Sequence, residues 1–135
     1  MNKEITVETD GQGLYEITDE VRGAVRASGV REGLCTIFIR HTSASLIIQE
    51  NADPSVQRDL EAWLNRLVPE EDRIYTHNDE GPDDMPAHIK SALTAVSLSV
   101  PVMGGEIMLG RWQGVYVWEH RTSPHTRRVV VNVLG

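Results

Sequence analysis

The sequence has a single cysteine, Cys35, and no long apolar run. One cysteine excludes an internal disulfide and a cysteine-based zinc cluster, and it suits a reducing compartment. No apolar run approaches the length needed to cross a bilayer, and the amino end lacks a charged segment followed by an apolar core. We therefore expect a soluble, cytoplasmic protein.

Positive charge is also scarce, with 13 lysines and arginines against 20 aspartates and glutamates, a net charge of −7 and a pI near 5.1. The field of such a chain repels phosphate backbones and anionic lipids. Neither nucleic acid nor a membrane is therefore an expected partner. The sequence also lacks a phosphate loop, a dinucleotide fingerprint, a GxSxG elbow and an HExxH run.

The composition is that of a folded globular protein, with 40% hydrophobic and 24% charged residues in 135. This length fits one domain, residues 1–135, and can bury roughly two thirds of the surface that the unfolded chain would expose.

Alternating patterns predict a sheet-rich fold. Ile5 and Val7 alternate with polar residues, and a turn at Gly11 to Gly13 predicts a hairpin with residues 14–17. Residues 34–41 resemble a strand buried on both faces. Gly104 and Gly105 predict a hairpin turn followed by a long return strand from Ile107 to Glu119. Further strands are predicted at 44–49, 96–100 and 128–133.

Helix signals fall between these strands. Thr18 can cap a short helix that ends at Gly29. Asp53 followed by Pro54 predicts a second helix up to Pro69, whose Trp63 and Leu64 fit core packing. A third helix should begin near Asp84 or Pro86. We therefore predict an α+β fold, a largely antiparallel β-sandwich with two to three inserted helices.

Histidines gather with carboxylates and amides where the strand patterns stop. Imidazole titrates near neutrality and is the commonest metal ligand, so these groupings suggest a site, although a solvated loop would also explain residues 77–84. The three clusters are His41 with Ser43, Glu50, Asn51 and Asp53; His77, Asn78 and Asp79 with Asp83, Asp84 and His88; and Arg111, Gln113, Glu119 and His120.

His88 falls in the first turn of the third helix, where the helix dipole disfavours imidazolium and leaves a neutral ring. Neutral imidazoles with a carboxylate and an open position are typical of a catalytic metal site. We therefore expect His41, His77 and His88 as ligands of a divalent metal, Zn or Mg. Their spacing is not diagnostic, because His77 and His88 are too far apart for one helical face.

One basic cluster stands out in this acidic chain: Arg121, His125, Arg127 and Arg128. Guanidinium groups bind phosphate oxygens bidentately, so a small phosphorylated ligand could be anchored here with the help of Ser43. The alternative is a basic surface turn.

Several motifs, in order, resemble a known family. They are HTSAS from His41, ENADP from Glu50, DLEAWLNRLVP from Asp59, YTHND from Tyr75, PAHIKSAL from Pro86 and LGRWQGVYVWEHR from Leu109. Together they resemble the YjbQ family, some members of which are described as secondary thiamine-phosphate synthases. The resemblance covers nearly the whole chain beyond the first strand.

The resemblance implies a compact α+β sandwich that assembles as a homotrimer around a polar pocket. Its implied pocket residues are His41, Glu50, Asn51, His77, His88, Gln113 and Glu119. The implied activity is weak thiamine phosphate synthesis, in which a pyrimidine methyl diphosphate joins a thiazole phosphate and pyrophosphate is released.

The candidate site residues divide into catalytic and substrate-binding groups. We expect His41, His88, Glu119 and Gln113 in catalysis, and Ser43, Glu50, Asn51, Arg121 and Arg127 in substrate binding. Two alternatives remain: a metal-dependent hydrolase of another small substrate, and a non-catalytic protein that binds a phosphorylated metabolite. The family commonly has threonine where this chain has Arg111, which could alter the choice of ligand.

Overall fold

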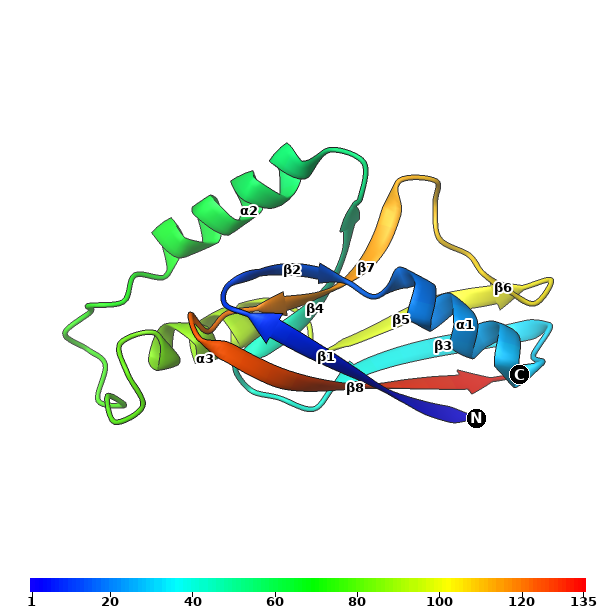
Figure 1. Ribbon diagram of the computed structural model, residues 1–135, viewed down its shortest axis with the longest axis horizontal. Helices are drawn as coiled ribbons and strands as arrows, with labels where there is room; N and C mark the ends of the chain where they lie inside the picture. The colour runs from blue at the N-terminus through cyan, green and yellow to red at the C-terminus, as the bar shows by residue number, and fades with distance from the viewer.

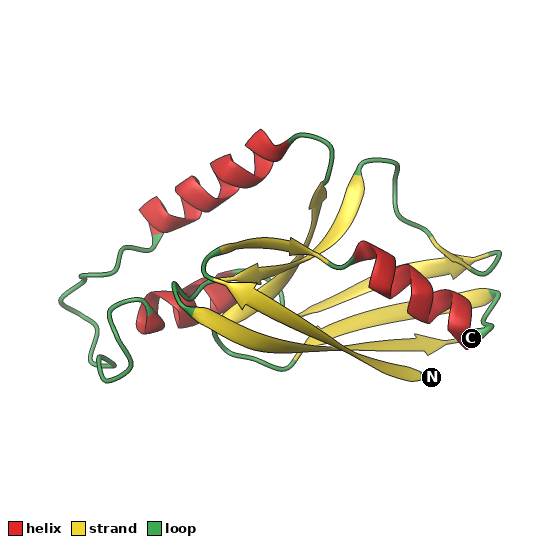
Figure 2. Cartoon of the chain, in the orientation of Figure 1, coloured by secondary structure: helices red, strands yellow, loops and turns green.

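The computed structural model describes residues 1–135 as two antiparallel sheets with three helices. The larger sheet has the strand order β1-β8-β3-β5-β6, and the smaller has the order β2-β7-β4. The strands are β1 (Asn2–Asp10), β2 (Gly13–Glu16), β3 (Glu32–Ile39), β4 (Ala44–Glu50), β5 (Ser97–Met103), β6 (Glu106–Ile107), β7 (Gln113–Glu119) and β8 (Pro124–Leu134). The helices are α1 (Thr18–Ser28), α2 (Pro54–Leu67) and α3 (Asp84–Leu93). Figure 1 and Figure 2 show both sheets side by side, with α2 standing away from them.

The predicted α+β class is confirmed, and its core lies between the two sheets and α1. Alternate residues of each strand point inward, as the pleat requires. Fully buried examples are Ile37 of β3, Val117 of β7 and Val129 of β8, and Val21 of α1 packs into the same cluster. Figure 1 shows α1 lying along this layer.

The helix ends follow the local signals with one exception. The Asp53 side chain accepts a hydrogen bond from the backbone N–H of Ser55 at 2.9 Å, and Pro54 occupies the first turn, where its missing donor costs nothing. Gly29 ends α1 with a φ of 71°, a conformation that glycine adopts without strain. Thr18 does not cap α1, because its hydroxyl donates to Glu16 and accepts from the backbone N–H of Val115.

The predicted connections between strands need two corrections. β1 and β2 do not form a hairpin: β1 pairs with β8 and β2 with β7, so the turn at Gly11 carries the chain from one sheet to the other. The long return strand is also wrong, because β6 ends at Ile107 and β7 begins at Gln113 in the other sheet. In both places a short connection carries the chain from one sheet to the other, which local periodicity does not encode. The hairpin turn at Gly104 and Gly105 is confirmed.

Several apolar side chains predicted to be buried lie on the surface of the chain. β3 is buried on one face only, since Leu34 is 44% and Phe38 is 46% exposed. Trp63 of α2 is 52% exposed, and Leu64 alone of that helix is buried. Leu64 packs with Val68 and Trp118 in a small separate cluster. Leu34 and Phe38 leave an apolar patch on the outer face of the larger sheet.

Candidate metal centre and the adjoining polar network

A cluster of two histidines and one carboxylate forms at the start of α3. Asp84 and His88 are four residues apart, so they lie on one face of the helix, and the preceding loop brings His77 to the same place. The Oδ2 atom of Asp84 is 2.6 Å from Nε2 of His77 and 3.2 Å from Nε2 of His88. All three donor atoms lie within 4.8 Å of one another, a spacing suited to one metal ion.

The surrounding backbone fixes the orientation of His88. Its Nδ1 lies 2.9 Å from the carbonyl oxygen of Thr42, which can only accept a hydrogen bond, so Nδ1 carries a proton. In the neutral ring, Nε2 then presents a lone pair to the carboxylate of Asp84. Two lone pairs facing each other require a proton or a cation between them. A histidine held by a backbone carbonyl in this way is typical of a metal ligand.

Arg121 orients the carboxylate from the other side. Its Nη1 lies 2.8 Å from Oδ1 of Asp84, and its Nε donates to Oδ2 of Asp83 at 2.8 Å. Burial alone would raise the pKa of Asp84, whose side chain is 2% exposed, but the hydrogen bond from His77 and the charge of Arg121 outweigh it and lower that pKa. Asp84 is therefore ionised at neutral pH, as a metal ligand must be.

A second, more deeply buried network surrounds Arg127 and Glu119. The Arg127 guanidinium donates to Oε1 of Glu119 at 2.7 Å and to the hydroxyl of Ser43 at 3.0 Å. Thr9 donates to the same glutamate at 2.6 Å. Burial would raise the pKa of Glu119, but these hydrogen bonds more than offset it and lower the pKa. Both members of the pair are therefore charged and satisfied inside the protein.

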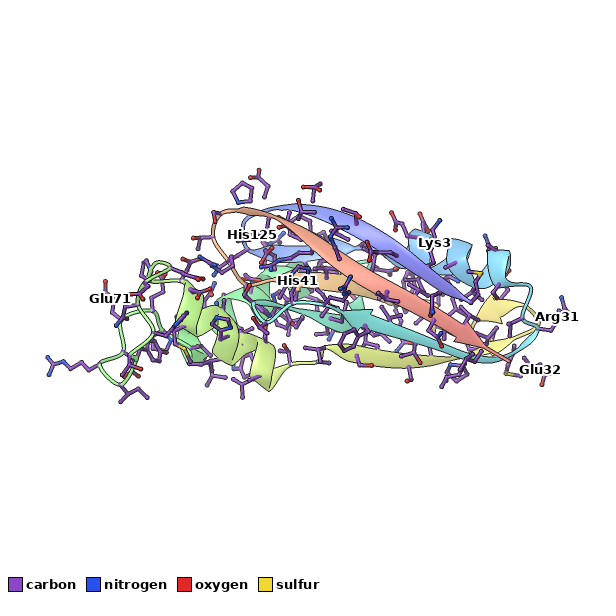
Figure 3. The ribbon with its side chains drawn as sticks, turned by 90° about the horizontal axis from the view of Figure 1, so that it is seen from below. Lys3, Arg31, Glu32, His41, Glu71 and His125 are labelled. Carbon is purple, nitrogen blue, oxygen red and sulfur yellow. The ribbon has the colours of Figure 1, made fainter.

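His41 borders this network. The backbone N–H of Arg128 donates to its Nε2 at 2.9 Å, so the neutral ring carries its proton on Nδ1. This nitrogen lies 3.3 Å from Nη1 of Arg127, a donor from which it then accepts no hydrogen bond. Burial, followed by the charge of Arg127, lowers the pKa of His41. His41 is thus neutral at pH 7. Figure 3 shows it between the sheet and α3.

The two clusters adjoin each other. The backbone N–H of Arg121 donates to Oε2 of Glu119 at 3.1 Å, and the loop that carries His41 supplies the carbonyl that holds His88. His41 and His88 line one cavity of about 250 Å³, together with Thr42, Ser91, Ala92 and Val96. Folding therefore brings His41, Ser43, His77, His88, Glu119, Arg121 and Arg127 to one end of the sandwich.

Glu50, Asn51 and Gln113 lie elsewhere in the chain. Glu50 pairs with Gln113 at the first residue of β7, whereas Glu119 is the last residue of that strand. Six steps of about 3.3 Å along the strand separate those ends by about 20 Å. The side-chain oxygen of Gln113 accepts from the N–H of Gly110 at 2.7 Å, and Asn51 is exposed. One chain alone does not unite all the residues predicted for the pocket.

Arg111 lies near the Gln113 end of β7. Its guanidinium lies over the Trp112 ring, 4.7 Å from the centroid, and both residues are exposed. Arg111 therefore stands beside Gln113 and far along β7 from the histidine cluster.

Two of the three predicted metal ligands lie in this cluster. His77 and His88 belong to the cluster, but His41 does not, and Asp84 provides the third donor. The sequence could have indicated Asp84 as a ligand, because an Asp-x-x-x-His spacing within a helix puts both side chains on one face. Nitrogen donors with one carboxylate suit zinc better than magnesium, which prefers oxygen ligands alone.

The fold and the cluster together define a class, an antiparallel α+β sandwich with a His-Asp-His centre beside a buried arginine–glutamate pair. Residues 3–135 match the model of the UPF0047 protein YjbQ-like family, and the chain belongs to that family, as the motifs predicted. A UPF0047 protein of Synechocystis is 53% identical over 97% of this chain and 89% of its own length. The YjbQ protein of Escherichia coli is 40% identical over 98% of this chain and 96% of its own.

Solved structures agree with the fold. A YjbQ/UPF0047 family protein of Clostridium acetobutylicum superposes with a TM-score of 0.90 at 34% identity, covering 98% of this chain and 99% of its own. A conserved hypothetical protein of Thermus thermophilus has a TM-score of 0.87 at 35% identity over the same shares. As for membranes, none of the three helices has both the length and the apolar character that a bilayer crossing demands.

Proposed function

We propose that the protein is a metal-dependent enzyme that acts on a small phosphorylated substrate, with a divalent transition metal held by His77, Asp84 and His88. The observation that carries this proposal is the convergence of two imidazole Nε2 atoms on one oxygen of a buried carboxylate. Three protein ligands leave a coordination position for substrate, and both histidines are partly exposed, so a substrate can approach from their side.

The reaction we propose is thiamine phosphate synthesis. A new C–N bond forms between the methylene carbon of the pyrimidine diphosphate and the thiazole ring nitrogen. The C–O bond to the diphosphate breaks, and its electron pair leaves with pyrophosphate. The exchange moves no proton and produces a thiazolium cation. Its main requirement is therefore stabilisation of the negative charge that develops on the leaving group.

A divalent ion held by His77, Asp84 and His88 would supply that stabilisation as a Lewis acid. Arg121 and Arg127 were the other candidates for this task, but each guanidinium is already paired with carboxylates, Asp83 and Asp84 in one case and Glu119 in the other. A diphosphate would have to compete with those carboxylates. His41 and His88 line the adjoining cavity, where a heterocyclic ring can lie against Ala92 and Val96.

Metal content is the first test. Protein purified without added metal should contain about one zinc ion per chain by elemental analysis, since three donors hold the ion. His77→Ala and Asp84→Asn should lose it. His125→Ala is the matched control, because that ring bonds only to the Ser123 carbonyl and lies outside the cluster. Wild-type protein that takes up no zinc on dialysis against it would refute the centre.

Activity is the second test. The zinc-loaded protein should form thiamine phosphate and pyrophosphate in equal amounts from the two phosphorylated precursors. Chelation should abolish product formation, added zinc should restore it, and His88→Ala should remain inactive. If the protein binds zinc but makes no thiamine phosphate, the proposal of synthase activity is refuted and the proposal of a metal centre stands.

Both arginines are already paired with carboxylates, which favours one alternative. It is a metal-dependent hydrolase of a small substrate that carries less charge than a diphosphate. The same loaded protein, offered phosphate monoesters and carboxylic esters, would then release phosphate or acid at a rate that falls in Asp84→Asn. Tight binding of a phosphorylated metabolite without turnover would instead indicate a binding protein.

We also propose a homotrimer. The apolar outer face of the larger sheet supports self-association: Leu34, Phe38, Met103 and Leu134 are each 44–63% exposed there. A neighbouring copy could also bring its Glu50 and Gln113 to the histidine cluster, which these residues do not reach within one chain. Patches of this kind mark protein–protein contacts.

A further inference from the structure

Lys90 is a buried charge on the side of α3 that faces away from the metal centre. Two residues correspond to about 200° around a helix, so Lys90 and His88 point in opposite directions. Lys90 is 2% exposed, and its ammonium donates to the side-chain oxygen of Asn65. None of the ion pairs in the protein includes Lys90.

An ammonium group has three donors, and Asn65 satisfies one of them. Leaving buried charged donors without acceptors is costly. A ligand with an acceptor oxygen would supply what the protein does not.

The space for such a ligand is a cavity of about 230 Å³, here termed the Lys90 pocket. Its polar lining consists of Gln12, Asn65, Glu70, Asp83, Lys90 and Thr122. These residues come from the β1–β2 turn, α2 and the loop after it, α3 and the β7–β8 turn. The Asn65 side chain donates to Gln12 at 3.2 Å, and this contact fixes the amide that holds Lys90.

The charges around the pocket select the class of ligand. Asp83 is already paired with Arg121 at 2.8 Å, so Lys90 and Glu70 are the charged residues of the lining that no ion pair includes. An inorganic anion would satisfy Lys90 but would meet the carboxylate of Glu70. We propose that the Lys90 pocket binds a small zwitterion of the α-amino acid class, with its carboxylate on Lys90 and its ammonium toward Glu70.

The test exploits the fact that the chain has two lysines, Lys3 and Lys90. Protein labelled with carbon-13 at lysine Cε gives two NMR signals, which Lys3→Arg assigns. Lys3 is exposed and lies far from α3, so it serves as an internal reference (Figure 3). L-serine should shift the Lys90 signal in a saturable way and leave Lys3 unchanged. N-acetyl-L-serine and L-serinamide, which lack one charge each, should bind at least tenfold more weakly.

Glu70→Gln should weaken serine binding at least tenfold while the amide spectrum outside the pocket stays that of the wild type, which shows that the fold is intact. Glu71→Gln is the matched control, because this neighbour is exposed and does not line the pocket. The proposal is overturned if millimolar serine leaves the Lys90 signal in place, if Lys3 shifts equally, or if inorganic phosphate reproduces the shift.

Discussion

Glu119 and Arg127 form an ion pair with almost no access to solvent, their side chains being 0% and 4% exposed. Glu119 is the last residue of β7, Arg127 lies in β8 of the other sheet, and the two are joined through Oε1 and Nε at 2.7 Å. A buried pair of this kind resists the loss of one partner, since the remaining charge stays buried without compensation.

Arg127→Met should therefore lower the free energy of unfolding by about 3–5 kcal/mol, measured by urea denaturation. The double variant Arg127→Met with Glu119→Leu should lose less than the sum of the two single losses. Glu4→Gln is the control, because Glu4 pairs with Arg128 at 2.9 Å on the exposed surface, where such pairs contribute under about 1 kcal/mol. Additive single losses would show that the two side chains are not coupled.

His120 should make the protein sensitive to mild acid. It is fully buried, its Nε2 lies 2.8 Å from the Ser45 hydroxyl and its Nδ1 has no partner. Burial, followed by the charge of Lys90, lowers its pKa from 6.5 to about 3. Below pH 6.5, His120 is therefore protonated in the unfolded chain but stays neutral in the native state down to about pH 3. Stability contributed by neutral His120 is complete above pH 6.5 and is lost between pH 6.5 and 3.

The expected loss at pH 5 is about 2 kcal/mol, from 1.5 pH units at about 1.4 kcal/mol each. Urea midpoints measured between pH 7 and pH 5 should show it. His120→Gln should flatten this dependence, and His125→Gln should leave it unchanged, since His125 lies near the start of β8 and its side chain is not fully buried. An equally steep pH dependence in His120→Gln would place the cause elsewhere.

Leu64 should control the attachment of α2. It is 2% exposed and packs with Val68 and Trp118, and the indole N–H of Trp118 donates to Glu61 of the same helix at 2.7 Å. Leu64→Ala should cost about 2–5 kcal/mol and raise hydrogen exchange in α2 more than in β3. Leu67→Ala should stay within about 0.5 kcal/mol, because that side chain is 53% exposed. Equal effects of the two variants would contradict the packing.

Phe38 should control self-association. It projects from the outer face of the larger sheet and is 46% exposed in the single chain. Phe38→Glu should convert a trimer to monomers in sedimentation at micromolar concentration, because a charge in an apolar contact is costly. Ile74→Glu, at an 80% exposed site in the loop after α2, should leave the assembly unchanged. A wild-type protein that sediments as a monomer would end the trimer proposal.

Much of the fold follows from short-range signals. Asp53 with Pro54 and the left-handed Gly29 define helix ends through the chemistry of one or two residues, and alternation predicts strands such as β8. The pairing of strands does not follow in this way. The break between Ile107 and Gln113 moves the chain to another sheet, although the residues on both sides keep a strand-like pattern.

The site shows the same division. Strand patterns alone predict that histidines and acids stand at strand ends, and the four-residue interval from Asp84 to His88 places a carboxylate and an imidazole on one helix face. Packing of distant segments is what adds His77 to this cluster, pairs Arg127 with Glu119 and puts Gln113 at the far end of β7. Spacing fixes neighbours within a helix or strand, but contacts between distant segments depend on how the sheets pack.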